Sequence, residues 1–238
     1  MKFFLFCLLI INFSLAFAKE ELLVVTENWP PYNYLNKQGK LIGDSTKVIK
    51  EILAQTDITY KTHVYPWARS FQIAAHRKNT LIYSIYKTDE RANKFYWYCP
   101  ITRPTPMHFY KMSKNTSIQV NNIEQAKQFV IGLIRGDWSQ AYLQDLDFKV
   151  GEQLDLAAEM SINTNKLIAG RIDLIINSDL GMALELQKMN LPINSVTKLF
   201  TIDLSGQAEI CMAINKDSSK DLIQKITLAF ESFKNSQK

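Results

Sequence analysis

Glycine is scarce in this sequence, with 8 residues among 238, about half the usual share of ~7%. The glycine-rich motifs that cradle phosphates and dinucleotides are absent, as is the G-x-S-x-G motif of a serine nucleophile. The three histidines, His63, His76 and His108, have no metal-ligand spacing to one another or to cysteine. We therefore expect no cofactor, no metal site and no catalytic residue.

Cysteine is also scarce, and three residues are too few for a disulfide scaffold. Cys7 lies in an N-terminal apolar run, which leaves Cys99 and Cys211. These two could close a loop of more than 100 residues, or they could be two buried thiols. The residues alone leave both interpretations open.

Apolar residues are plentiful, at 47% of the chain, which excludes an intrinsically disordered protein. The formal net charge of +5 is small and dispersed, so we expect no nucleic-acid partner. A chain of 238 residues can form one large domain or two small lobes, each with its own core.

The first 18 residues are typical of a secretory signal peptide. Lys2 precedes an apolar run from Phe3 to Ala18, which ends in a small-x-small cleavage site at 16–18. The alternative is an uncleaved membrane anchor, but the apolar run is short for a transmembrane helix. We expect cleavage before Lys19 and a periplasmic protein.

Apolar runs of strand length alternate with helical patterns along the rest of the chain. Strands are predicted at 22–26, 58–65, 81–86, 129–134, 172–177 and 208–215, and helices at 45–53, 66–77, 139–144, 162–169 and 222–233. This alternation indicates βαβ units and mainly parallel sheets. Residues 102–112, with two prolines and little helical pattern, could pass between lobes. We therefore predict two α/β lobes.

Polar and aromatic residues follow the predicted strands, at the edge where α/β lobes bind ligands. Aromatic faces can sandwich a small organic molecule, and an arginine can bind a carboxylate through two hydrogen bonds. The candidate ligand-binding residues are Trp29, Tyr32, Trp67, Arg69, Ser84, Tyr86, Arg91, Arg135, Asp137, Trp138, Ser178 and Asp179.

Four motifs resemble family 3 of the solute-binding proteins of ABC transporters, which includes binders of polar amino acids. They are NWPPY at 28–32 with GKLIGD at 39–44, PWARS at 66–70, SIYKTDER at 84–91 followed by Phe95 and Pro100-Ile101, and AGRID at 169–173. The motifs occur in the same order and spacing as in the family, and the likeness runs from about Leu22 to Phe233, which is nearly all of the chain after the signal peptide.

The resemblance implies a type II periplasmic-binding-protein fold. One lobe would comprise residues 19–102 plus 206–238 and the other 103–205, with two crossing segments and the ligand between the lobes. By position, Arg91 matches the arginine that binds the ligand's α-carboxylate, with Ser84 and Tyr86 beside it. Trp29 and Trp67 match positions that flank the ligand, and Asp137 and Trp138 match a second-lobe loop that donates backbone N–H groups.

The sequence departs from the family where amino-acid binders place an acidic residue against the ligand's ammonium. Ser178 stands there, with Asp179 one residue later, so a one-residue slip could turn the carboxylate away from the cleft. A carboxylate ligand is therefore better supported than an α-amino acid. The resemblance also places Cys99 and Cys211 in neighbouring segments, which makes a disulfide between them a hypothesis.

The resemblance implies a monomeric, non-enzymatic binding protein that delivers a small carboxylate-bearing ligand to an ABC permease in the membrane. Two alternatives remain: a dehydratase-like enzyme on the same fold, and a module that presents its ligand to a separate receptor. The enzyme would require a cleft carboxylate with a raised pKa.

Overall fold

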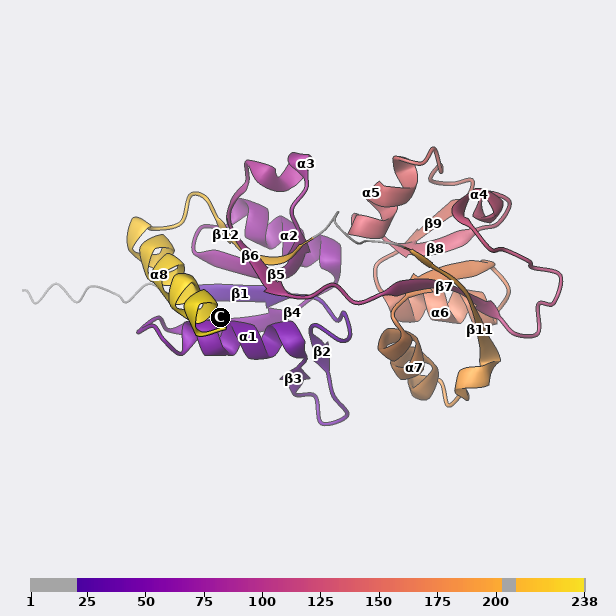
Figure 1. The fold of residues 1–238 in the computed structure, drawn as a ribbon, viewed down its shortest axis with the longest axis horizontal. Helices are drawn as coiled ribbons and strands as arrows, with labels where there is room; N and C mark the ends of the chain where they lie inside the picture. The colour runs from indigo at the N-terminus through magenta and orange to yellow at the C-terminus, as the bar shows by residue number, and fades with distance from the viewer. Residues whose placement is uncertain (1–20, 203–208, 238) are drawn as a thin grey trace, which may run out of the picture.

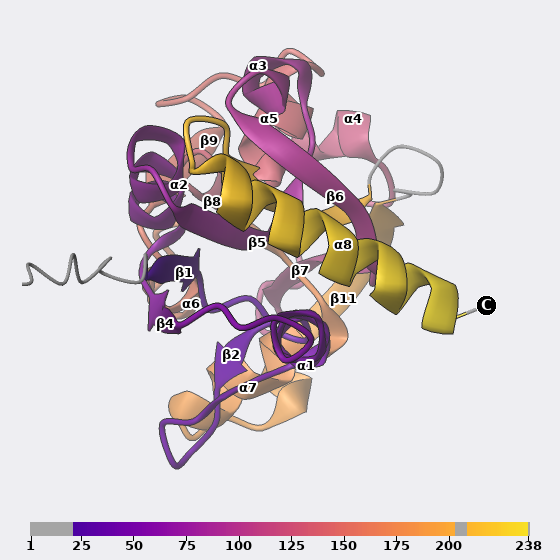
Figure 2. The same ribbon diagram turned by 90° about the vertical axis from the view of Figure 1, so that its left-hand side faces the viewer.

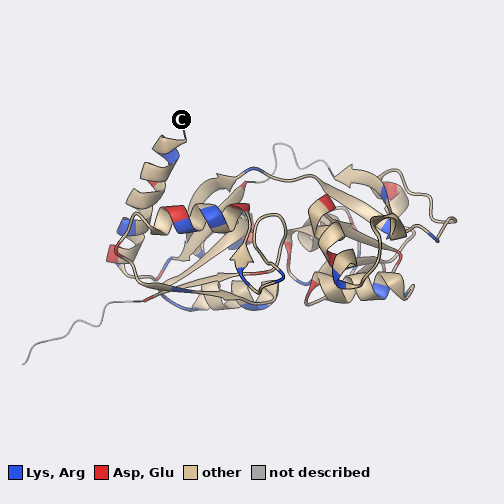
Figure 3. Cartoon of the chain, turned by 90° about the horizontal axis from the view of Figure 1, so that it is seen from below, with Lys and Arg blue, Asp and Glu red and all other residues tan. Residues whose placement is uncertain are grey.

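The computed structural model describes residues 21–202 and 209–237, so the predicted signal peptide lies outside the described residues. The described chain forms two lobes, each built on a five-stranded sheet with helices packed against it (Figure 1). Charged residues of both signs are dispersed over both lobes (Figure 3), as the sequence indicates. Within 21–202 and 209–237, no helix is both long and apolar enough to cross a membrane.

The first sheet has the strand order β4-β1-β5-β12-β6. Its strands are β1 (Leu22–Thr26), β4 (Tyr60–Val64), β5 (Thr80–Tyr86), β6 (Phe95–Thr102) and β12 (Ile210–Asn215), beside a small hairpin of β2 (Tyr34–Leu35) and β3 (Leu41–Ile42). Its helices are α1 (Asp44–Leu53), α2 (Trp67–His76), the short α3 (Asp89–Ala92) and α8 (Lys220–Ser236), which runs across the sheet in Figure 2.

Alternating residues along the strands fill two cores in the first lobe, because successive strand side chains point to opposite faces. In β12, Met212 and Ile214 pack with α1 and α8, whereas Cys211 and Ala213 pack with α2 on the other face. The two faces of the first sheet therefore support separate cores.

The second sheet has the strand order β11-β7-β10-β8-β9. Its strands are β7 (Met107–Met112), β8 (Ile131–Ile134), β9 (Leu154–Ala157), β10 (Leu174–Asn177) and β11 (Val196–Ile202). Its helices are α4 (Ile123–Ala126), α5 (Trp138–Gln144), α6 (Met160–Ile168) and α7 (Asp179–Lys188), with a 3₁₀ turn η1 (Ile193–Ser195) before β11. Leu143 of α5 packs on one face, and Leu167 of α6 and Leu186 of α7 pack on the other.

The sheets are mixed, and not mainly parallel as the alternation of strands and helices predicts. In the first, β4, β1 and β5 are parallel while β12 pairs antiparallel with both β5 and β6. In the second, β10, β8 and β9 are parallel while β7 pairs antiparallel with β10 and β11. The antiparallel strands flank the two passages between the lobes, where strands can pair without a crossover helix between them.

Several strands carry no clear sequence signal. β6, β9 and β11 were not predicted, and β7 lies in the stretch 102–112 that the sequence suggests as a connection. The connection itself spans only 103–106. The second passage between the lobes falls between β11 and β12, and residues 203–208 lie outside the described part of the chain.

Helix α1 begins at Asp44 and has Gly43 at its N-cap position, whereas the sequence predicts a helix from residue 45 with Ser45 as the capping residue. Gly43 has φ 121°, and a side chain there would lie 2.4 Å from the backbone oxygen of Tyr32. Only glycine fits this conformation and this approach. Gly43 thus holds the loop after β1 against the start of α1.

Candidate functional site

Four aromatic rings from both lobes meet beyond the end of β1. Trp29 lies 4.6 Å from Tyr32 and 5.7 Å from Tyr86, measured between ring centroids, and Trp138 of the second lobe lies 5.8 Å from Tyr86. The Tyr32 hydroxyl accepts a hydrogen bond from the backbone N–H of Thr105 in the crossing segment. This cluster therefore connects the first lobe, the second lobe and the passage between them.

Arg91 is buried and faces the second lobe. Its Nη2 donates to the Gly136 carbonyl at 3.0 Å and its Nη1 to the Tyr86 carbonyl at 3.3 Å. Trp67 also donates to the Gly136 carbonyl through Nε1, and its ring lies under the Arg91 guanidinium at 5.1 Å. Two donors of the first lobe therefore converge on one carbonyl oxygen of the second. Burial lowers the pKa of Arg91, while Asp137, Glu90 and Glu27 oppose the shift.

The carboxylate of Asp137 accepts its hydrogen bonds from residues of its own helix, α5. As the N-cap of α5, its carboxylate accepts hydrogen bonds from the Gln140 backbone N–H at 3.0 Å and from the Ser139 hydroxyl at 2.8 Å. Burial raises its pKa to about 6, and these hydrogen bonds and Arg91 limit the rise.

Glu27, directly after β1, is a buried carboxyl group that the candidate set omits. Burial and the neighbouring Asp137 raise its pKa to about 8, against the attraction of Arg91. Its position directly after a predicted strand is a signal that could have identified it.

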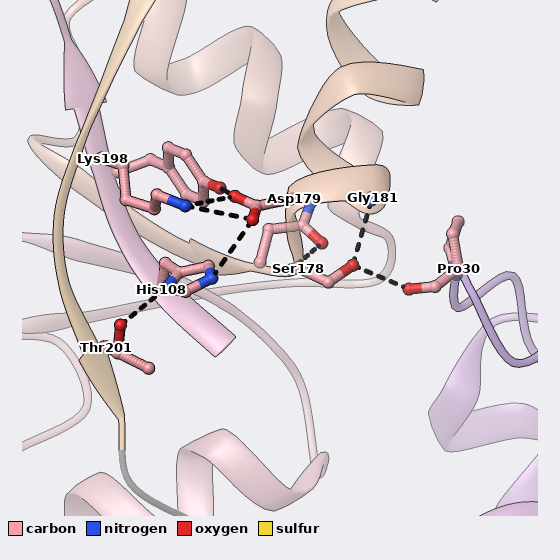
Figure 4. A network of polar contacts seen from close by, with 9 residues as sticks. Pro30, His108, Ser178, Asp179, Gly181, Lys198 and Thr201 are labelled. Atoms are coloured by element: carbon pink, nitrogen blue, oxygen red, sulfur yellow. Dashed lines mark hydrogen bonds and ion pairs between the residues drawn. The ribbon is translucent and has the colours of Figure 1, made fainter. Parts of the chain in front are cut away.

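Ser178 and Asp179 point in opposite directions (Figure 4). The Ser178 hydroxyl caps α7 by accepting from the Gly181 N–H and donates to the Pro30 carbonyl of the first lobe, both at 3.0 Å. Asp179 instead accepts hydrogen bonds from Tyr110 at 2.5 Å and Lys198 at 2.9 Å, and its side chain is 65% exposed. These hydrogen bonds lower the pKa of Asp179.

Two adjoining pockets lie between the lobes, one of about 520 Å³ and one of about 30 Å³. The larger has the size of a small-molecule site. Residues of both lobes line both pockets, among them Glu27, Asn28, Ile134, Met160 and Glu185. Glu185 lies inside α7, where no motif indicates a binding residue.

The structure gathers most of the candidate residues around these pockets. Trp29, Asp137 and Trp138 line the smaller pocket and Trp67 the larger, while Tyr32, Ser84, Tyr86, Arg91 and Ser178 are buried nearby in the same lobes. The hydroxyls of Ser84 and Tyr86 have no hydrogen-bond partner among the described residues. Arg69, Arg135 and Asp179 line neither pocket; Arg69 stacks on Tyr65 at 4.3 Å and Arg135 is exposed.

A disulfide joins Cys99 of β6 to Cys211 of β12, with a Cα separation of 4.5 Å, inside the range that a disulfide requires. Glu209 lies close to the two sulfurs, and this is the one group of metal-ligating atoms close together among residues 21–202 and 209–237. Because both sulfurs are bonded to each other, the group does not form a thiolate metal site.

Comparison with known proteins places this arrangement in a family. The model of the bacterial extracellular solute-binding proteins, family 3, matches residues 22–238. The chain belongs to this family. No curated protein sequence matches the chain.

Solved structures share the fold of this family 3 protein at low sequence identity. An ancestral arginine-binding protein bound to arginine is 18% identical with a TM-score of 0.73, and the alignment covers 90% of this chain and 92% of that one. The arginine-, lysine-, histidine-binding protein ArtJ from Geobacillus stearothermophilus is 20% identical with a TM-score of 0.73, covering 91% and 90%. A histidine kinase sensor domain is 15% identical with a TM-score of 0.72, covering 91% of each chain. The predicted two-lobed fold is therefore confirmed, with mixed sheets.

Proposed function

We propose that this family 3 protein is exported to the periplasm, captures a small amino-acid-like ligand between its lobes and delivers it to an ABC permease. We retain residues 19–102 plus 206–238 and 103–205 as the two lobes, acting as a monomer without a cofactor. The supporting observation is the convergence of Arg91 and Trp67 on one acceptor, the Gly136 carbonyl, beside aromatic-lined pockets.

A ligand carboxylate would use these same donors when the lobes open. In this structure Gly136 supplies the acceptor oxygen, and a carboxylate offers two oxygens to a guanidinium with better charge complementarity. The unpartnered hydroxyls of Ser84 and Tyr86 supply further polar groups nearby. Opening would be a hinge motion between the lobes, in which the described passage at 103–106 takes part.

Replacement of Arg91 tests this role. We expect Arg91→Ala to abolish the rise in melting temperature that amino acids and small carboxylates cause in the wild-type protein. Arg77→Ala, which removes an exposed arginine at the end of α2, is the matched control and should retain the rise. An unchanged rise in Arg91→Ala would contradict the proposed carboxylate site.

A dehydratase-like enzyme is a second candidate, supported by the raised pKa of Glu27, which suits a general acid or base at neutral pH. Proton NMR of a panel of hydroxy acids incubated with the protein tests it: dehydration that Glu27→Gln abolishes would favour the enzyme. Presentation of a ligand to a separate receptor has the fold-level support of the histidine kinase sensor domain.

A further inference from the structure

The region between the lobes contains more buried carboxylates than buried cations, whereas charges of both signs are dispersed over the rest of both lobes (Figure 3). Glu27 and Glu185 are buried and Asp137 is half-buried. The three come from separate segments of the chain, and they face the buried Arg91 and the exposed Lys188. Asp137 is held by the α5 cap. Glu27 and Glu185 are therefore the two carboxyl groups that remain for a ligand.

Glu185 is 3% exposed and incompletely paired. Its Oε1 lies 2.7 Å from Lys188 Nζ, whereas its Oε2 is buried without a hydrogen-bond partner among the described residues. Leaving a buried carboxylate oxygen unsatisfied is costly, so such an atom at a pocket wall indicates a missing donor. Glu185 lines both pockets, on the α7 face that also carries Gly181.

Glu27 lies on the first-lobe wall of the same two pockets. It is 8% exposed, and no described residue donates a hydrogen bond to its carboxyl group. The other charged groups around it are Arg91, Asp137 and Glu185, with Lys37, Glu159 and Lys188 lining the larger pocket. Without a ligand, a proton satisfies Glu27 at neutral pH, since burial and Asp137 raise its pKa to about 8.

Aromatic rings also line the two pockets between the lobes. Trp29 and Trp138 line the smaller pocket, and Tyr65 and Trp67 line the larger. Carboxylates next to aromatic faces favour organic cations, which interact with both.

We propose that the ligand carries, apart from any α-ammonium, an ammonium or guanidinium group that binds between Glu27 and Glu185, at the wall shared by the two pockets. This inference rests on the proposed ligand capture between the lobes and names the charge class of the ligand. The cationic group donates to Glu185 Oε2 and takes the place of the proton on Glu27. These residues differ from Ser178 and Asp179, the position to which the family resemblance assigns the ammonium.

Binding is then linked to pH. Below about pH 8 the cation must displace a proton from Glu27, so affinity rises by up to about tenfold for each pH unit and levels off above pH 8. At pH 7 up to one proton is released for each ligand bound.

Isothermal titration calorimetry with charge-matched probes tests the proposal. The pairs are L-arginine and its neutral analogue L-citrulline, L-lysine and L-norleucine, and putrescine and the dianion succinate, in phosphate and in Tris at pH 7 and pH 9. We expect at least one cationic probe to bind. The matched probe without that cationic group should bind about 100-fold more weakly or not at all, and binding of the cationic probe should release protons at pH 7.

Two variants and two controls connect that binding to the proposed residues. Glu185→Gln should weaken the cation at least about tenfold, and Glu27→Gln should weaken it at pH 9 and abolish the proton release. Glu231→Gln in the first lobe and Glu152→Gln in the second remove exposed carboxylates and should change neither quantity.

The outcomes separate this inference from the proposed function. Binding of the neutral or anionic probes without any cationic probe overturns the inference and leaves ligand capture standing. Cation binding that is unchanged in both glutamine variants also overturns it. If no probe of any charge binds, the proposed capture of amino-acid-like ligands fails and the inference fails with it.

Discussion

At the scale of single residues, the buried carboxyl of Glu27 ties the stability of the ligand-free protein to pH. Its pKa is about 8 in the folded chain against 4.5 in the absence of burial. Between these values the folded state binds the proton and the unfolded state does not. Stability is therefore highest at the acid end of this window and falls as pH rises toward 8.

We expect the melting temperature to fall between about pH 5 and pH 8, and Glu27→Gln to flatten this fall. The contribution of Glu27 is at most about 1.4 kcal/mol for each pH unit within the window. Asp137, with a pKa raised to about 6, adds to the fall only in the lower part of the window. The melting temperatures of the wild-type protein and of Glu27→Gln, measured at half-unit steps of pH, test this. If the two melting temperatures change with pH in parallel, the raised pKa of Glu27 is contradicted.

At the scale of elements, the disulfide joins two adjacent strands next to the passages between the lobes. β6 leads into the second lobe and β12 follows the return. The bond closes a segment with a sequence separation of 112 residues, which contains the whole second sheet. In the chain-entropy model, closing a loop of this length lowers the entropy of the unfolded chain and stabilises the folded protein by about 4.7 kcal/mol.

We expect the Cys99→Ser/Cys211→Ser variant to lose about 2–5 kcal/mol of unfolding free energy in urea. The wild-type protein treated with a reductant should match the variant, and the reductant should not affect the variant itself. Denatured, unreduced protein that begins at Lys19 should show no free thiol. Two titratable thiols would contradict the bond.

At the scale of the whole molecule, hydrogen bonds to backbone carbonyls hold the lobes together. Gly136 of the second lobe accepts from Trp67 and Arg91, and Pro30 of the first lobe accepts from Ser178. Ser178 also caps α7, the helix that carries Glu185, so the contact between the lobes and the position of Glu185 are coupled.

Replacement of Ser178 by alanine tests whether its hydrogen bond to Pro30 contributes to ligand binding, beyond its contribution to the stability of α7. Loss of the cap should cost about 1 kcal/mol, and loss of the bond to Pro30 should in addition weaken ligand binding. Asn122→Ala removes a comparable cap from α4 without a contact between the lobes, so it should lower stability but leave affinity unchanged. Equal affinities in the two variants, measured by calorimetry, would contradict a role for Ser178 in closure.

The sequence predicts the elements whose signals are local. The strand at 22–26 has the predicted bounds, and the apolar stripe of the last helix, which includes Ile226 and Phe230, is buried in the core. β9 and β11 escaped prediction because their burial is irregular and the strands beside them, rather than their own residues, stabilise them.

The sequence by itself determined the α/β class, the family and the aromatic and arginine residues at strand ends, because periodicity and short motifs are properties of neighbouring residues. Only the tertiary structure decided which groups face one another across the lobes. It placed Asp179 among Tyr110 and Lys198, gave Arg91 a carbonyl partner, and brought Glu27 and Glu185 to one pocket from positions 158 residues apart. Burial and long-range pairing set the charge of a site, and neither is encoded in the local pattern.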